Sequence, residues 1–192
     1  TSNATYVDNG INLKEFDGIK MDHQINFNHL KIATLGRISL QKNPTMFNQI
    51  AEAFPNVDFI WIGDGELRDK LTTPNIKVTG WVDNKTALNY LADTDIFILT
   101  SLWEGLPMAL LEAMYMKKIC IVSDVVGNRD VIHDEQNGYI CDSVNDFIKK
   151  VKSISTDRLM LPELIKKAHD DVVNHYNSTV MANEYKKIYT IK

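Results

Sequence analysis

Short apolar runs that are continuous rather than alternating most restrict how this 192-residue chain can fold. Continuous hydrophobicity predicts strands that are buried on both faces, as in a parallel sheet covered by helices. Each run is bounded by Gly, Pro, Asn or Asp, the residues that end strands. The predicted strands are Lys31–Leu35, Val57–Ile62, Ile76–Thr79, Ile96–Leu99, Ile119–Val122 and Gly138–Cys141.

Helical patterns lie between these runs and fill the end of the chain. The predicted helices are Pro44–Phe54, Thr86–Ala92, Pro107–Tyr115, Val144–Ile154, Asp157–Tyr176 and Ser178–Ile191. Strands that alternate with helices over short links imply right-handed crossovers. We therefore predict an α/β fold in which a doubly wound parallel sheet of about six strands is followed by C-terminal helices.

Charge and hydropathy exclude several classes of protein. The formal net charge of −4 argues against broad nucleic-acid binding, although a local basic site for phosphate stays open. No run approaches the ~20 apolar residues that span a membrane, and no secretory signal opens the chain. Cys120 and Cys141 lie in strand-like runs and are predicted to be small buried thiols in a reducing compartment. We predict a cytoplasmic protein, and a peripheral position at the inner face of a membrane stays open.

The loop after the first predicted strand has the composition of a phosphate site. Open α/β sheets bind ligands at the carboxyl ends of their strands. Here the order is Gly36, Arg37 and Lys42, followed by a helix that begins at Pro44. Gly lets the backbone approach a ligand, the basic residues supply charge, and the helix N-terminus adds partial positive charge. The loop is a candidate diphosphate site, and a solvated basic loop is the alternative.

The segment after the fourth predicted strand carries two glutamates. Glu104 lies in the loop and Glu112 in the early turns of the helix that Pro107 opens. Carboxylates accept hydrogen bonds from the vicinal hydroxyls of sugars. The alternative for Glu104 is a surface residue favoured by the helix dipole. The complete string from Ser101 to Ala113 favours a binding site.

An ordered set of motifs gives the chain a family resemblance. The set comprises Gly36-Arg37-x4-Lys42, Gly63-Asp64-Gly65, Gly80-Trp81-Val82, Ser101-x2-Glu104-Gly105-Leu106-Pro107 and Glu112-Ala113. It resembles the C-terminal, donor-binding domain of retaining GT-B glycosyltransferases. This is the glycogen-synthase-like and mannosyltransferase-like group, also called glycosyl transferases group 1 or family 4. The resemblance extends from about Asn9 to the last helix, and it implies a Rossmann-like fold.

The resemblance implies a role for each matching position, with Arg37, Lys42 and Glu104 as the catalytic residues. Arg37 and Lys42 would bind the donor diphosphate and offset the charge that grows on it as the sugar leaves. Glu112 would bind the ribose hydroxyls, and Glu104 would hold hydroxyls of the donor sugar. The other implied binding positions are Gly36 in the phosphate loop, Gly80, Trp81 and Val82 around the base, and Gly105, Leu106 and Pro107 against sugar and phosphate. Trp81 could equally be a core or interface aromatic residue.

The implied reaction transfers a glycosyl unit from a UDP- or GDP-sugar to an acceptor hydroxyl with retention. Surface polysaccharide or lipid-linked saccharide synthesis is the expected setting, without an essential metal ion. Asn9-Gly10-Ile11-Asn12 resembles the interdomain hinge, although Asp is common where Asn12 stands. We expect residues 1–30 to be a hinge from an N-terminal domain, 31–192 to be the donor-binding domain, and this part alone to be inactive. The alternatives are a nucleotide-sugar epimerase of the same fold and a non-catalytic binding module.

Some segments depart from the family or imitate other sites. The family often has Gly-Gly-x-Pro-Glu after the fifth strand, whereas this chain has Gly127-Asn128-Arg129-Asp130. Asp93-Thr94-Asp95 imitates a metal-binding Asp-x-Asp but precedes the fourth strand, at the wrong end of the sheet. Gly63-Asp64-Gly65 has Arg68 where a dinucleotide fingerprint needs its third Gly, so it predicts a close-approach turn near the donor. The histidines lack metal-ligand spacing; they are His23, His29, His133, His169 and His175.

Overall fold

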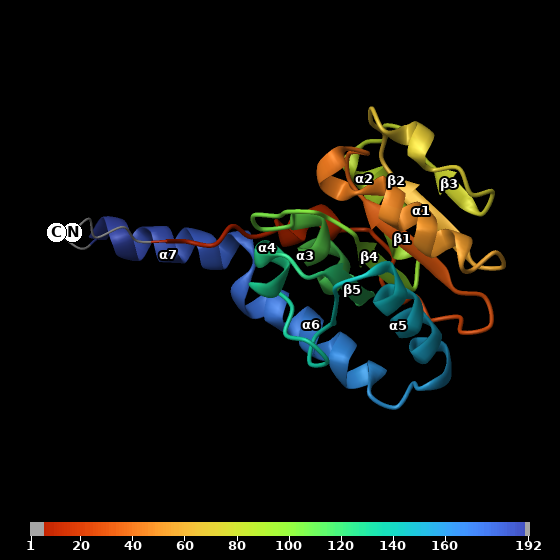
Figure 1. Ribbon diagram of the computed structural model, residues 1–192. Coiled ribbons are helices and arrows are strands. Elements are labelled where there is room, and N and C mark those ends of the chain that lie inside the picture. Colours follow the sequence, from red (N-terminus) through yellow and green to blue (C-terminus); the bar gives the residue numbers. More distant parts are fainter. Residues whose placement is uncertain (1–5, 191–192) are drawn as a thin grey trace.

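The computed structural model describes residues 6–190 and has one six-stranded parallel sheet at its centre (Figure 1). Its strands are β1 (Lys31–Leu35), β2 (Asp58–Ile62), β3 (Ile76–Val78), β4 (Ile96–Leu99), β5 (Ile119–Ser123) and β6 (Tyr139–Cys141). Their order across the sheet is β3-β2-β1-β4-β5-β6, and every neighbouring pair is parallel. The predicted doubly wound fold is confirmed, and its switch point lies between β1 and β4.

Helices cover both faces of this sheet. They are α1 (Pro44–Glu52), α2 (Asn84–Ala92), α3 (Met108–Tyr115), α4 (Val126–Arg129), α5 (Val144–Thr156), α6 (Leu161–His175) and α7 (Ser178–Thr190). Three short 3-10 turns are η1 (Leu13–Phe16), η2 (Leu40–Lys42) and η3 (Arg68–Lys70). α1 contacts α5, and α3 contacts α6. Two apolar clusters result, one containing Phe47 of α1 and Val151 of α5, the other containing Leu111 of α3 and Val172 of α6.

The predicted helix boundaries change where capping or proline decides them. α6 begins at Leu161 rather than Asp157, because Pro162 fits only the first turn, where its missing N–H costs nothing. α2 begins two residues earlier than predicted, since the Asp83 carboxylate accepts from the Thr86 N–H at 2.9 Å and caps the helix. The short helix α4 was not predicted, because one turn of helix has no periodicity to detect.

The segment before β1, predicted as a hinge, packs against the domain. Ile11, Phe16 and Ile19 are buried in the same apolar cluster as α3. The Phe16 ring meets the Tyr115 ring edge-on, with 4.6 Å between centroids. Packing therefore does not stop at the predicted boundary at residue 31. The first five residues of the predicted hinge lie outside the described residues, as does Ile191, the predicted end of the last helix.

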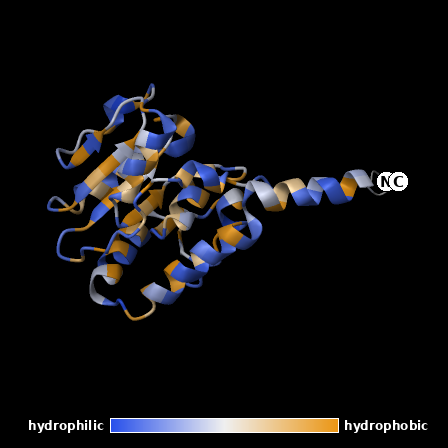
Figure 2. Ribbon diagram, turned by 180° about the vertical axis from the view of Figure 1, so that it is seen from behind, coloured by the Kyte–Doolittle hydropathy of each residue, from blue (hydrophilic) through white to orange (hydrophobic). Residues whose placement is uncertain are grey.

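Helix α7 projects from the body of the domain (Figure 1; Figure 2 gives the rear view). None of its described residues is buried. The hydropathy colours show hydrophobic residues concentrated in the strands, whereas α7 is mixed along its length. Between residues 6 and 190 no helix has the length and apolarity that a membrane span needs.

Asp93-Thr94-Asp95, which resembles a metal-binding Asp-x-Asp, lies at the amino end of β4. There it has a structural role. Asp95 is buried and accepts hydrogen bonds from the Lys31 N–H at 2.7 Å and from His23 Nε2 at 2.8 Å. Its carboxylate thereby joins the segment before β1 to the start of β4. Cys120 and Cys141 are buried free thiols, as predicted, and burial raises the pKa of Cys141 to about 12.

Candidate functional site

The loops after β1 and β2 meet at the carboxyl edge of the sheet. Gly36 donates its N–H to the Ile62 carbonyl at 2.9 Å, and Ile38 donates to the Asp64 carbonyl at 2.9 Å. Gly36 and Gly63 have φ values of 141° and 135°, which side chains disfavour. A Cβ on Gly63 would also overlap the Gly36 carbonyl oxygen. Gly63-Asp64-Gly65 is therefore a close-approach turn, and the structure shows that it approaches the backbone of the first loop. Its predicted proximity to the donor stays a prediction.

Lys42 and Glu104, both predicted as catalytic residues, form an ion pair at this edge. Lys42 Nζ lies 2.6 Å from Glu104 Oε1, and the side chains are 16% and 6% exposed. Ser101 Oγ donates to the same carboxylate oxygen at 2.6 Å. The Coulomb attraction within a shielded ion pair of this kind is screened less by water than the attraction within an exposed pair.

Gln41 joins the loops that carry this pair. Its side-chain amide donates to the Trp103 carbonyl at 3.0 Å and to Glu104 Oε2 at 3.3 Å. The backbone carbonyl of Gln41 accepts a hydrogen bond from the Leu102 N–H at 2.8 Å. Sequence reasoning missed Gln41 and the contact made by Ser101. The available signal was their position inside the two motifs. Nothing in a single sequence pairs Gln41 with Trp103, 62 positions away.

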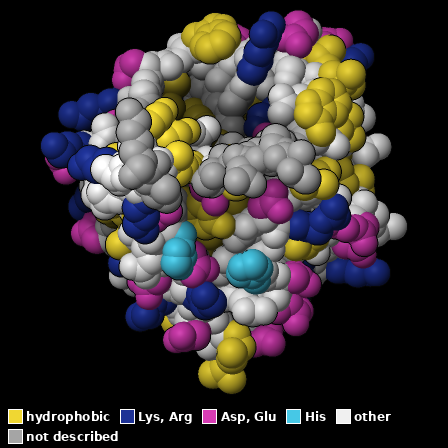
Figure 3. Space-filling view, turned by 90° about the vertical axis from the view of Figure 1, so that its left-hand side faces the viewer, with side chains coloured by type: hydrophobic (Ala, Val, Ile, Leu, Met, Phe, Trp, Pro, Cys, Tyr) yellow, Lys and Arg dark blue, Asp and Glu magenta, His cyan; other side chains and the backbone are white. Residues whose placement is uncertain are grey.

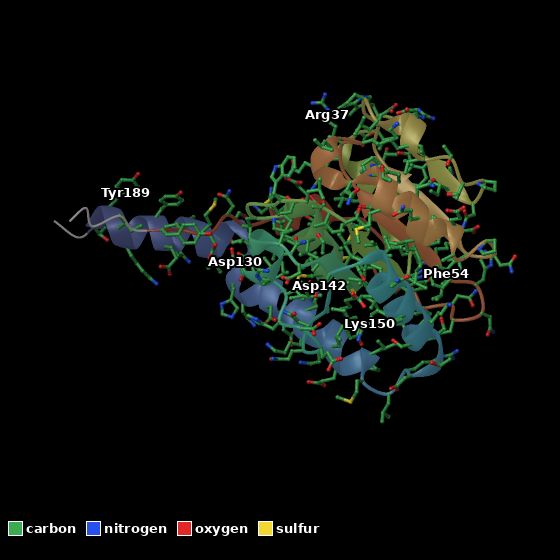
Figure 4. The ribbon with its side chains drawn as sticks, in the orientation of Figure 1. Arg37, Phe54, Asp130, Asp142, Lys150 and Tyr189 are labelled. Atoms are coloured by element: carbon green, nitrogen blue, oxygen red, sulfur yellow. The ribbon has the colours of Figure 1, made fainter. Side chains whose placement is uncertain are left out.

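Arg37 is not brought to the Lys42–Glu104 pair. Its side chain is 67% exposed and donates through Nε to Glu66 Oε2 at 3.0 Å. In the stick view it extends outward from the edge of the molecule (Figure 4). On either side of Arg37 the backbone is held to the loop after β2 by the hydrogen bonds of Gly36 and Ile38. The basic loop therefore presents Lys42 toward the site and Arg37 toward its margin.

Glu112 lies in the middle of α3, and its charged neighbour is Glu15. Burial raises the pKa of its carboxyl to about 7, and the nearby Glu15 carboxylate adds to this rise. Across residues 6–190 no hydrogen bond to the Glu112 carboxylate is formed, whereas Glu15 accepts from Asn84 Nδ2 at 2.6 Å. A half-buried carboxylate without a donor can accept hydrogen bonds from an incoming ligand.

The loop after β3 supplies the predicted base-binding positions. Gly80 has a φ of 74°, so a side chain there would be strained. Trp81 is 76% exposed, which excludes the core alternative, and Val82 packs partly against the core cluster around α3. Thr79 Oγ1 accepts from the Gly63 N–H at 3.0 Å and joins this loop to the loop after β2.

The Gly105-Leu106-Pro107 segment leads directly into α3, with Pro107 as its N-cap residue. Behind it lies α4, where a Cβ on Gly127 would overlap the Gly105 carbonyl oxygen. The glycine that remains from the family's Gly-Gly motif is therefore required by close packing against the Glu104 loop.

The side chains at the carboxyl edge of the sheet offer groups that can contact a polar ligand. Lys42 supplies an ammonium group and Glu104 a carboxylate, and the loops around them supply backbone groups. In the described part of the chain no group of three or more His, Cys, Asp or Glu side chains is placed to hold a metal ion. Figure 3 shows the side from which α7 projects, where basic, acidic and hydrophobic side chains are interspersed rather than gathered into a patch of one sign.

Comparisons with known proteins agree on one family. The family model described as "Glycosyl transferases group 1" matches residues 16–171. The UDP-Gal:alpha-D-GlcNAc-diphosphoundecaprenol alpha-1,3-galactosyltransferase of Escherichia coli is 31% identical over 179 residues, covering 84% of this chain and 46% of the relative. The chain spans about half or less of the length of this and the other curated relatives that it matches.

Solved structures share the fold at low sequence identity. Sucrose-phosphate synthase from Thermosynechococcus elongatus aligns with a TM-score of 0.85 and 16% identity, over 98% of this chain and 52% of that one. A point mutant of S. aureus TarM, solved with fondaparinux, alpha-GlcNAc-glycerol and UDP, aligns with a TM-score of 0.77 and 19% identity, over 99% and 40%.

Proposed function

Because the chain belongs to the glycosyl transferases group 1 family, we propose that it is the donor-binding half of a glycosyltransferase. The complete protein would transfer a glycosyl unit from a nucleoside-diphosphate sugar to an acceptor hydroxyl with retention of configuration. The observation that carries this proposal is the shielded Lys42–Glu104 pair at the carboxyl edge of the sheet, 2.6 Å apart. It combines a cation suited to a diphosphate with a carboxylate suited to sugar hydroxyls.

Each charged residue has a distinct part in the proposed reaction. Lys42 contacts the diphosphate and stabilises the negative charge that develops as the glycosidic bond breaks. Arg37 lies at the margin, and reaching the diphosphate requires it to leave Glu66. Glu104 holds hydroxyls of the transferred sugar, and Glu112 holds the ribose hydroxyls. The backbone of Gly80, Trp81 and Val82 frames the base.

Among nucleotides, the comparisons favour UDP over GDP. The E. coli relative is named for UDP-Gal, and the aligned TarM structure was solved with UDP. We propose a UDP-sugar as the donor and a lipid-linked or surface saccharide as the acceptor. The acceptor site lies in an additional domain, and the complete enzyme works in the cytoplasm, peripheral to the inner face of the membrane.

Calorimetric titration of this chain with UDP and with UDP-galactose tests the proposal. We expect both to bind, and GDP to bind more weakly. Supplied with its acceptor domain, the protein should transfer the sugar from one member of a donor panel, and NMR of the product should show the retained anomer. Absence of binding by every nucleotide would refute the site. Formation of an epimer, or binding without transfer by the complete protein, would replace the transferase by one of the two alternatives.

Replacing Glu104 with glutamine should leave the affinity for free UDP within about twofold of wild type. Its proposed partners are on the sugar, and the change also releases Lys42 from its ion pair. In the complete enzyme the same substitution should lower turnover by about tenfold or more, since each ~1.4 kcal/mol of lost transition-state stabilisation is tenfold in rate. Calorimetry and initial rates measure the two effects. A large loss of UDP affinity would mean that the donor lies in the opposite orientation.

Nucleotide binding should be insensitive to a chelator. Lys42 and Arg37 are proposed to do for the diphosphate what a metal ion does elsewhere, so EDTA should leave the calorimetric affinity for UDP unchanged. Loss of binding in EDTA that Mg²⁺ restores would contradict this assignment. It would return attention to Asp93, which lies at the opposite end of β4 and binds Lys31 at 2.7 Å.

A further inference from the structure

A buried asparagine begins a line of hydrogen bonds that ends at Glu104. Asn128, in α4, is 0% exposed. Its Nδ2 donates to the Ser123 carbonyl at 2.8 Å and lies 3.3 Å from Ser123 Oγ. Ser123 is the last residue of β5, so Asn128 ties α4 to the end of this strand.

Ser123 in turn contacts the loop that follows β4. Its hydroxyl donates to the Ser101 carbonyl at 2.5 Å. Ser101 in turn donates its own hydroxyl to Glu104 Oε1 at 2.6 Å. Because Asn128, Ser123 and Ser101 are all buried, water cannot readily substitute for a missing member of the line.

Asn128 carries a cost that stability alone does not explain. Within the part of the chain that the structure describes, its Oδ1 is buried without a hydrogen-bond partner. An unpaired buried oxygen destabilises a fold. The adjacent Gly127 packs against the Gly105 carbonyl, so α4 supports the Glu104 loop at two points. Asn128 also stands where the family often has its second Gly.

We propose that Asn128 and Ser123 are positioning residues for the Glu104 carboxylate. They act through Ser101 and hold one carboxylate oxygen at the place where it accepts from both Ser101 and Lys42. The other oxygen, which Gln41 Nε2 approaches only to 3.3 Å, is thereby directed toward the transferred sugar. This inference rests on the proposed function of Glu104. It gives Asn128, which stands where the family often has its second Gly, a role in sugar recognition. Nucleotide binding is assigned to other loops.

The variants Asn128→Ala and Ser123→Ala test the proposal, and Asn137→Ala is the matched control. Asn137 is also buried and donates to the Val131 carbonyl at 3.0 Å and to Asp171 Oδ2 at 2.8 Å. Losing it removes comparable hydrogen bonds outside the line to Glu104. Ser123→Ala is the smaller change and serves if Asn128→Ala does not fold.

Two readouts separate positioning from a general loss of structure. The first is the side-chain carboxyl ¹³C resonance of Glu104 in the ligand-free chain, assigned through Glu104→Gln. It should shift in both test variants and stay in place in Asn137→Ala. The second is affinity: UDP should bind within about twofold of wild type, whereas UDP-galactose should bind about five- to tenfold more weakly, as expected for one weakened hydrogen bond. In a Ser101→Ala background, adding Asn128→Ala should cause little further loss of UDP-galactose affinity, because both residues act through the same line of hydrogen bonds.

An unmoved Glu104 resonance in both test variants would overturn the proposal, even if the wild-type chain binds UDP as expected. Equal losses for UDP and UDP-galactose would overturn it as well, because they indicate a purely structural role. If the resonance moves but the wild-type chain binds no nucleotide, the proposed function fails and takes the role in sugar recognition with it. Because the resonance is measured without ligand, failure of the proposed function can be distinguished from failure of the positioning role.

Discussion

Replacing Lys42 with alanine is expected to weaken UDP binding by this chain by about ten- to a hundredfold. A hydrogen bond to a charged group contributes roughly 1.5–3 kcal/mol, and each ~1.4 kcal/mol is tenfold in affinity. Lys42 is mostly shielded, so solvent screens its interaction with a diphosphate less than that of an exposed lysine. Arg37→Ala should have the smaller effect, because this side chain is largely exposed and bound to Glu66.

Loss of Lys42 also leaves the Glu104 carboxylate, 6% exposed, without its cation. Removing one partner of a shielded pair is destabilising because the other charge stays desolvated. The double variant Lys42→Ala/Glu104→Gln should therefore recover thermal stability but not UDP affinity. Lys152→Ala, an exposed lysine on α5, is the matched control and should change neither. Calorimetry and thermal melts measure the two effects, and wild-type affinity in Lys42→Ala would refute the assignment of the diphosphate site.

The strands, and the position of Lys42 and Glu104 at the carboxyl edge of the sheet, were predictable because both follow from local chemistry. Continuous apolar runs such as Ile96–Leu99 admit burial on both faces and little else. The carboxyl-edge rule then places Lys42 and Glu104 at one end of the sheet. Their separation of 2.6 Å was beyond the sequence, since it depends on η2 turning Lys42 back toward the loop after β4.

What the sequence did not reveal depends on contacts between distant residues. Arg37 faces outward because the first loop is pinned to the loop after β2, which no local pattern encodes. The segment before β1 was expected to be a hinge because Asn9-Gly10-Ile11-Asn12 resembles one, and no local pattern shows that Phe16 and Ile19 pack in the same cluster as α3. The raised pKa of Glu112 comes first from burial and then from the nearby Glu15 carboxylate, and neither can be read from one local stretch of sequence.

Glu112→Gln is expected to stabilise this chain at alkaline pH while weakening UDP binding. The pKa of Glu112 is raised in the folded chain from 4.5 to about 7. Between these values the folded state binds more protons than the unfolded state, so the free energy of unfolding falls as pH rises. The loss is complete above about pH 7 and amounts to at most about 3 kcal/mol. Glutamine does not ionise, so the variant should be more stable than wild type at about pH 8 and similar at about pH 4.5.

The same substitution removes an acceptor proposed for the ribose hydroxyls, so UDP affinity at about pH 8 should fall about tenfold. Wild-type affinity should itself decline as pH drops below about 7, because protonation competes with the ribose for the carboxylate. In Glu112→Gln that decline should flatten. Denaturant titrations at the two pH values, with calorimetry over the same range, measure both effects. A variant that gains stability at alkaline pH yet binds UDP like wild type would confirm the buried charge and refute the ribose contact. Unchanged stability at both pH values would mean that Glu112 is hydrated and paired in solution.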